Sequence, residues 1–196
     1  MTVIMGAAYP DLFAAIGVLA GCAYATCTDI DGSQAYAQMG PRARVMPAFV
    51  VHSATDNFVP FPEGEAVVQQ WLGTDDLADN GAADGSISRM PSSSENHGLD
   101  GSLISGAGSP GDLCARPQHW GCPGGAAGFK GSYPYTIQHF VDANGRSLLD
   151  FWIVYGATHA YLDGDPNYKW TDPLGPNVTE AAYRFFMAHP MEGRKR

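Results

Sequence analysis

The stretch Ser147-Leu-Leu-Asp-Phe-Trp-Ile-Val-Tyr155, followed by Gly156-Ala-Thr-His-Ala160, decides the fold that the sequence predicts. Its first part is rich in branched and aromatic side chains, as is typical of a buried β-strand. Its second part is a loop that carries His159 just beyond the strand. In open α/β sheets, binding and catalytic residues lie beyond the carboxyl ends of the strands. A histidine at this place, between small residues that leave its ring accessible, is a candidate general base.

Composition and charge restrict the classes of protein to which the chain can belong. The 196 residues are 45% hydrophobic and 16% charged, with 24 Gly and 14 Pro, which indicates a globular chain with many turns. The net charge of -9 argues against a nucleic-acid partner, because such surfaces need clustered Lys and Arg. No apolar run is long enough to cross a bilayer, and the apolar N-terminal stretch lacks the positive charge of a signal peptide. The sequence therefore predicts neither a nucleic-acid partner nor a membrane partner.

The four cysteines form two close pairs, Cys22/Cys27 and Cys114/Cys122. Neither pair has the two-residue gap of a zinc site, and no further Cys or His ligands stand beside them. Two local disulfides fit an exported protein, whereas four free thiols are the alternative. We therefore expect an extracellular protein.

Strands and helices alternate along the chain. Strands are predicted over Phe13–Ala20, Pro47–His52, Tyr133–Val141 and Ser147–Tyr155, and helices over Met1–Tyr9, Ser33–Met39, Glu63–Leu72 and from a cap at Asn177 or Thr179 to about Ala188. An Asn-Gly turn at 144–145 predicts that the strands on either side of it are antiparallel neighbours. The segment 73–131 is rich in Gly, Ser, Asp and Pro, and we interpret it as an insertion. The pattern predicts a mainly parallel α/β sheet with flanking helices, in one domain over residues 1–196.

Two residues after buried strands match two members of a Ser-His-Asp hydrolase site. In that chemistry a serine attacks an acyl carbon, a histidine takes its proton, and a carboxylate orients the imidazole. Asp56 follows one strand and His159 follows a later one, which is the order of acid and histidine in α/β-hydrolases. The alternative to a catalytic pair is that Asp56 is an ordinary turn residue and His159 an ordinary loop residue. His52 lies within a strand, so we expect it to be a buried or supporting group.

The sequence offers no convincing nucleophile. Its nearest approach to G-x-S-x-G is Ala107-Gly-Ser-Pro-Gly111, in which Pro110 has no N–H to give to an oxyanion hole. Ser109 also follows Asp56 instead of preceding it, and no predicted strand leads into it. Ser53 shares the loop of the acid. We therefore expect neither serine to act as the nucleophile.

Four short motifs occur in the order found in one esterase family. His52-Ser-Ala-Thr-Asp56-Asn-Phe-Val-Pro60 resembles the acid loop, and Gly156-Ala-Thr-His159-Ala160 the histidine loop, of polyhydroxybutyrate depolymerase-like esterases, relatives of feruloyl and acetylxylan esterases. Tyr9-Pro-Asp-Leu-Phe-Ala-Ala15 is similar to the segment after their nucleophile. Thr171-Asp-Pro-Leu-Gly-Pro-Asn177 is similar to their last turn. The resemblance covers most of the chain outside 73–131.

This resemblance implies the C-terminal part of an α/β-hydrolase fold, with Asp56 as the acid and His159 as the base. The family's nucleophile would precede Met1, so we expect the chain alone to be inactive and to expose the side of the sheet that the preceding strands cover. The chain departs from the family at two positions, with Ser53 in place of Gly and Tyr161 in place of Trp.

Three interpretations remain open at this point. The first is the C-terminal part of a secreted serine esterase acting on polyesters or on feruloyl or acetyl esters of polysaccharides, with no metal or organic cofactor. The second is a non-enzymatic secreted binding domain that uses the 73–131 loop. The third is an esterase completed by a separate N-terminal half that carries the serine. Tyr161, Tyr168 and Trp170 are candidates for lining an ester pocket, or for packing.

Overall fold

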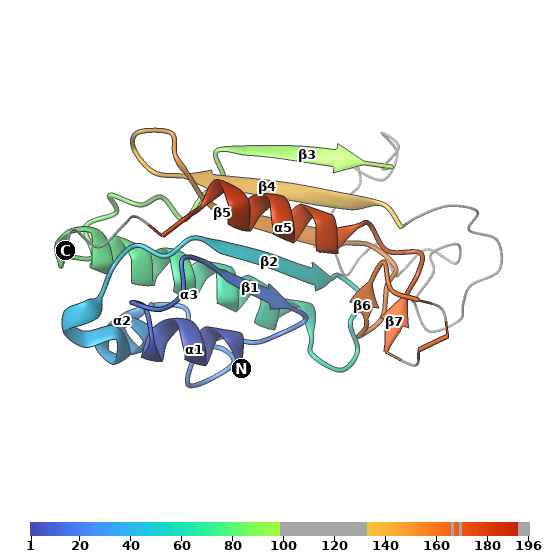
Figure 1. The fold of residues 1–196 in the computed structure, drawn as a ribbon, viewed down its shortest axis with the longest axis horizontal. Coiled ribbons are helices and arrows are strands. Elements are labelled where there is room, and N and C mark those ends of the chain that lie inside the picture. The colour runs from blue at the N-terminus through green and yellow to red at the C-terminus, as the bar shows by residue number, and fades with distance from the viewer. Residues whose placement is uncertain (99–132, 166, 169, 192–196) are drawn as a thin grey trace.

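The computed structural model describes residues 1–98, 133–165, 167–168 and 170–191, and its centre is a five-stranded sheet with the order β1-β2-β5-β4-β3 (Figure 1). The strands are β1 (Ile16–Leu19), β2 (Ala48–Ser53), β3 (Ser93–His97), β4 (Tyr135–Val141) and β5 (Ser147–Val154). Strands β1, β2 and β5 are parallel, while β4 and β3 are antiparallel to their neighbours. The predicted α/β class is confirmed, with a sheet that is parallel on one side.

Helices cover both faces of the sheet (Figure 1). On one face lie α1 (Thr2–Ala8), α2 (Ser33–Met39) and α3 (Phe61–Asn80), and a short 3-10 turn at Gly40–Arg42 directly follows α2. On the other face lies α5 (Val178–Ala188). Beyond the end of β5, β6 (Tyr161–Leu162) and β7 (Thr171–Asp172) form a small parallel pair that the sequence did not predict.

Strand β2 lies between β1 and β5 in the sheet and is buried at all of its positions. Its neighbours on both edges and the helices on both faces leave no side of it in contact with solvent. Such a strand has an almost continuous apolar sequence, which explains why Pro47–His52 was recognisable. Trp71 of α3 is fully buried, and its Nε1 donates to the carbonyl oxygen of Met46 at 2.7 Å, just before β2 begins. Helix α3 and β2 are thereby fixed to each other.

The expected end of the helix at Leu72 is wrong, because α3 continues to Asn80. Residues of its last turns are polar yet buried, which hides the helical pattern. Asp75 Oδ1 accepts from the Met46 N–H at 2.8 Å, and Asp76 Oδ1 accepts from the Ile87 N–H at 2.9 Å. Part of the segment 73–131 is therefore regular structure, since β3 lies within it as well. Residues 99–132 of the expected insertion lie outside the described residues.

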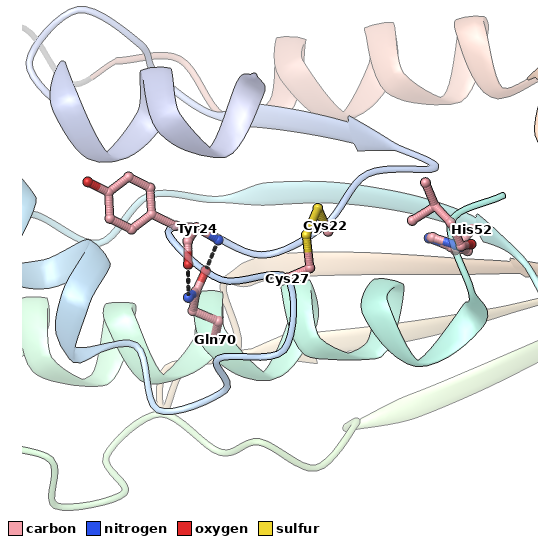
Figure 2. The surroundings of a disulfide bond; sticks show 6 residues. Cys22, Tyr24, Cys27, His52 and Gln70 are labelled. Atoms are coloured by element: carbon pink, nitrogen blue, oxygen red, sulfur yellow. Dashed lines mark hydrogen bonds between the residues drawn. A yellow bond between two sulfur atoms is a disulfide. The ribbon is translucent and has the colours of Figure 1, made fainter.

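A disulfide between Cys22 and Cys27 closes the loop after β1, as the spacing predicted (Figure 2). The buried Gln70 of α3 holds this loop, because its Oε1 accepts from the Tyr24 N–H at 2.6 Å and its Nε2 donates to the Tyr24 carbonyl at 3.0 Å. The predicted pair Cys114/Cys122 lies outside the described residues.

Asn177 caps α5, which confirms one of the two predicted caps. Its Oδ1 accepts from the Glu180 N–H at 2.9 Å, so one of the unpaired N–H groups of the first turn is satisfied. We expect Asn177→Ala to lower the free energy of unfolding by about 1 kcal/mol. Urea denaturation measures this loss. Asn177→Asp keeps an oxygen acceptor, so its free energy of unfolding should fall much less. An equal fall in both variants would contradict the capping role.

Candidate functional site

The candidate site lies where the parallel strands β2 and β5 end side by side. Ser53 and Val154, the last residues of these strands, are paired in register. The loop after β2 carries Asp56, and the loop after β5 carries His159. Two loops that are far apart in the sequence therefore meet at one edge of the sheet, as expected for an open α/β sheet.

The structure brings Asp56 and His159 into direct contact. His159 Nδ1 lies 2.8 Å from Asp56 Oδ2, while the carboxylate of Asp56 is fully buried and the imidazole is 29% exposed. Asp56 Oδ1 accepts two backbone hydrogen bonds, from the N–H of Phe58 at 2.8 Å and of Val59 at 2.9 Å. Because the carboxylate can only accept at Oδ2, Nδ1 of His159 carries the proton and Nε2 presents its lone pair. The buried carboxylate thus fixes both the orientation and the tautomer of the histidine.

Two hydroxyl groups tie the loops of the acid and the histidine together. The Oγ of Ser53 donates to the carbonyl oxygen of Ala157 at 2.5 Å, and the Oγ1 of Thr55 donates to the same oxygen at 2.6 Å. Gly156, just before Ala157, has a φ of 119°, which glycine adopts without strain. The side chains of Ser53 and Thr55 thus fasten the loop after β2 to the loop after β5.

His52 lies beneath the pair and is buried, as the sequence predicted. Its Nε2 lies 2.9 Å from the carbonyl oxygen of Val59 and 3.9 Å from Asp56 Oδ2. Burial lowers the pKa of the His52 imidazole, and the Val59 hydrogen bond and the negative charge of Asp56 oppose this shift to a smaller extent. The ring is therefore held in its neutral form.

Phe58 is part of the site, although the sequence did not single it out. Its ring centroid lies 5.0 Å from that of His159, and the residue is 74% exposed. An aromatic side chain that is exposed beside a candidate base is placed to contact an incoming molecule. The only signal in the sequence was its position two residues after Asp56, which does not indicate on which side of the loop the ring lies.

Among the described residues, the hydrogen bonds and ring contacts of His159 are those with Asp56 and Phe58, and none joins it to the other candidate residues. Tyr161, Tyr168 and Trp170 are all exposed, so they do not pack in the core. Tyr161 donates or accepts a hydrogen bond with the hydroxyl of Thr179 at 3.0 Å. Ser109 lies outside the described residues. Within the described part of the chain, no hydroxyl or thiol forms a hydrogen bond with Nε2 of His159.

One group of possible metal ligands occurs among the described residues. The sulfurs of Cys22 and Cys27 and a carboxylate oxygen of Glu63 lie within 4.8 Å of one another. Since the two sulfurs are joined in a disulfide, they are not thiolate ligands. Over the same part of the chain, none of the helices has the length and apolar character that crossing a membrane requires.

The Asp56–His159 pair is suited to one kind of chemistry. An imidazole with a free Nε2 and a carboxylate on Nδ1 can take a proton from a hydroxyl group and return it to a leaving group. No protein-family model matches the sequence, and no curated protein matches it either. A functional proposal for this chain therefore depends on its residues and their geometry.

Proposed function

We propose that the chain is the C-terminal part of a secreted serine esterase with an α/β-hydrolase fold, similar to the polyhydroxybutyrate depolymerase-like esterases. The observation that carries the proposal is the 2.8 Å contact between His159 Nδ1 and the buried Asp56 carboxylate. It joins two of the four motifs on which the resemblance depends, the one that contains Asp56 and the one that contains His159. The mixed sheet with helices on both faces is compatible with such a fold.

In this mechanism, His159 and Asp56 act as a unit. Nε2 of His159 takes the proton of a serine hydroxyl as that oxygen attacks the ester carbonyl carbon. Asp56 stabilises the imidazolium that forms through Oδ2, while the N–H groups of Phe58 and Val59 donate to its Oδ1. The imidazolium then gives its proton to the leaving alcohol, which leaves an acyl-enzyme. Water, activated by the same Nε2, hydrolyses this intermediate and releases the acid.

We place the nucleophilic serine outside the printed sequence, on a strand beside β1 in a preceding segment or a separate chain. Among the described strands, β1 pairs only with β2, so its other edge is open (Figure 1). Leu19 and Ala20 at the end of β1 line one small cavity together with Thr158 and Ala160 of the histidine loop. A parallel strand added at this edge would end close to His159.

The proposed substrates are carboxylic esters, either polyesters or feruloyl and acetyl esters of polysaccharides. Phe58 beside His159 provides an aromatic surface for the acyl or alcohol part of such an ester. The Cys22–Cys27 disulfide supports secretion into an oxidising environment. The mechanism needs no metal or organic cofactor.

The 196-residue chain alone is expected to release p-nitrophenol from p-nitrophenyl butyrate no faster than buffer does, because among the described residues no serine forms a hydrogen bond with His159 and the nucleophile is proposed to lie outside the printed sequence. A colorimetric assay measures this release. Turnover by the chain alone that a serine-directed phosphonate abolishes would contradict the placement of the nucleophile. The serine would then have to lie within the printed sequence.

The esterase proposal itself is tested by adding the missing part. The DNA that precedes the codon for Met1 should encode, in frame, a G-x-S-x-G segment, or a separate chain with that segment should co-purify with this one. The completed protein should hydrolyse p-nitrophenyl butyrate, and the phosphonate should stop it. A completed protein that acts on none of polyhydroxybutyrate, feruloyl esters, acetyl esters and the soluble ester would refute the proposal.

A further inference from the structure

The buried histidine His52 uses one ring nitrogen and leaves the other without a partner. Its Nε2 lies 2.9 Å from the carbonyl oxygen of Val59, whereas its Nδ1 is buried and has no hydrogen-bond partner. A carbonyl oxygen can only accept, so the proton must be on Nε2. A second proton on Nδ1 would be a buried N–H without an acceptor, which is costly. The geometry therefore points to a single state of the ring, neutral and protonated on Nε2.

Helix α3 keeps this ring in place. A Cβ atom at Gly64, in the first turns of α3, would lie only 2.4 Å from His52 Nδ1, so the helix backbone packs directly against the ring. The ring of Phe61 meets it edge-on, with the centroids 6.2 Å apart. Figure 2 shows His52 at the end of β2 beside the start of α3. The ring cannot turn away from Val59 without displacing the helix.

Val59 connects His52 to the proposed acid. Its carbonyl oxygen accepts from His52, and its own N–H donates to Asp56 Oδ1 at 2.9 Å. We infer that His52 is a positioning residue, which holds the 56–60 loop so that Asp56 keeps one oxygen on the backbone and the other on His159. This inference rests on the proposed function in one respect only, that Asp56 and His159 are taken as the acid and the base.

The charges around His52 fit this role. Nε2 lies 3.9 Å from Asp56 Oδ2, which is too long for a hydrogen bond, so the ring does not compete with His159 for that oxygen. Asp56, Glu63 and His159 are the charged or titratable groups that act on the ring. A protonated His52 would draw Asp56 away from His159. Its neutral state therefore keeps the acid available to the base.

The test uses the 196-residue chain, NMR of its imidazole nitrogens and two variants. In the unaltered protein, we expect His52 to be neutral with the proton on Nε2 at pH 6.5, where an ordinary imidazole is about half protonated. In His52→Leu, the downfield resonance of the His159 Nδ1 proton should be lost, and hydrogen exchange at the Val59 amide should become about five-fold faster. In His52→Gln, whose amide can still donate to Val59, both should stay as in the unaltered protein.

The controls separate positioning from general stability. His139→Leu removes another imidazole from the same sheet, and we expect it to leave the His159 resonance unchanged. A His52→Leu protein that keeps the His159 resonance would overturn the inference. If that variant does not fold, a His52 ring that is charged at pH 6.5 or protonated on Nδ1 in the unaltered protein overturns it instead. None of these measurements uses ester turnover, so they stand whether or not the esterase proposal fails.

Discussion

Trp71→Ala is expected to lower the free energy of unfolding by about 3–5 kcal/mol, a large part of the stability of a domain of this size. Trp71 is fully buried in the core, and a Cβ added at Gly6 of α1 would lie only 3.0 Å from its ring. The substitution leaves a cavity between α1, α3 and the sheet. It also removes the hydrogen bond from Nε1 to the Met46 carbonyl. The shift of the urea midpoint at constant slope measures the loss.

Two further variants divide this effect into its causes. Trp71→Phe keeps most of the volume but leaves the Met46 carbonyl without its donor, so we expect a loss of about 1–3 kcal/mol. Tyr183→Ala removes an aromatic side chain that is exposed on α5, and it should change stability by less than about 0.5 kcal/mol. If Trp71→Ala were no more harmful than Tyr183→Ala, the packing of α3 against β2 described above would be wrong.

The strands were predictable where burial leaves a continuous apolar sequence. Strand β2 lies inside the sheet, between β1 and β5, and is buried at all of its positions, so Pro47–His52 stood out without any structural information. The hairpin between β4 and β5 was predictable as well, because an Asn-Gly turn joins two strands of suitable length. In these places the local sequence and the tertiary environment favour the same structure.

The second half of α3 and the strand β3 were not predictable for the opposite reason. Thr74, Asp75 and Asp76 are polar residues that the structure buries, and tertiary hydrogen bonds satisfy them. A sequence pattern cannot show such partners, which lie outside the helix and 11 to 42 residues away in the chain. Strand β3 is an edge strand with exposed polar residues, so its pairing with β4 left no apolar alternation to detect.

The candidate site also has features that could be predicted from the sequence and features that could not. Asp56 and His159 were predictable because each follows a recognisable buried strand, and parallel strands bring their carboxyl ends together. The link between the two loops was not predictable, because it depends on the carbonyl oxygen of Ala157 lying within reach of Ser53 and Thr55. Backbone groups carry no signal in the sequence. The same holds for the Val59 carbonyl that accepts from His52.

Asp56→Asn is expected to reverse the tautomer of His159. Oδ1 of Asp56 accepts hydrogen bonds from the backbone N–H groups of Phe58 and Val59. In the asparagine, only the amide oxygen can accept these two bonds, so it must take the place of Oδ1. The amide nitrogen then takes the place of Oδ2, which lies 2.8 Å from His159 Nδ1 in the unaltered protein. An NH₂ group can only donate, so Nδ1 must become the acceptor and the proton moves to Nε2. A ring protonated on Nε2 cannot take a proton from a serine.

Two measurements follow from this reversal. The imidazole nitrogen spectrum of the 196-residue chain should show His159 protonated on Nδ1 in the unaltered protein and on Nε2 in Asp56→Asn. For the proposed esterase, completed with its serine, the same substitution should lower kcat by about 10⁴-fold, as the wrong tautomer does in a Ser-His-Asp hydrolase. Asp150→Asn is the matched control, because Asp150 Oδ1 lies 2.7 Å from Nδ1 of His139 elsewhere on the sheet. That control should leave the tautomer of His159 and ester hydrolysis unchanged.

An unchanged tautomer in Asp56→Asn would mean that the backbone bonds to Oδ1 do not fix the orientation of the acid. A changed tautomer with full activity would mean that Asp56 and His159 are not the acid and base.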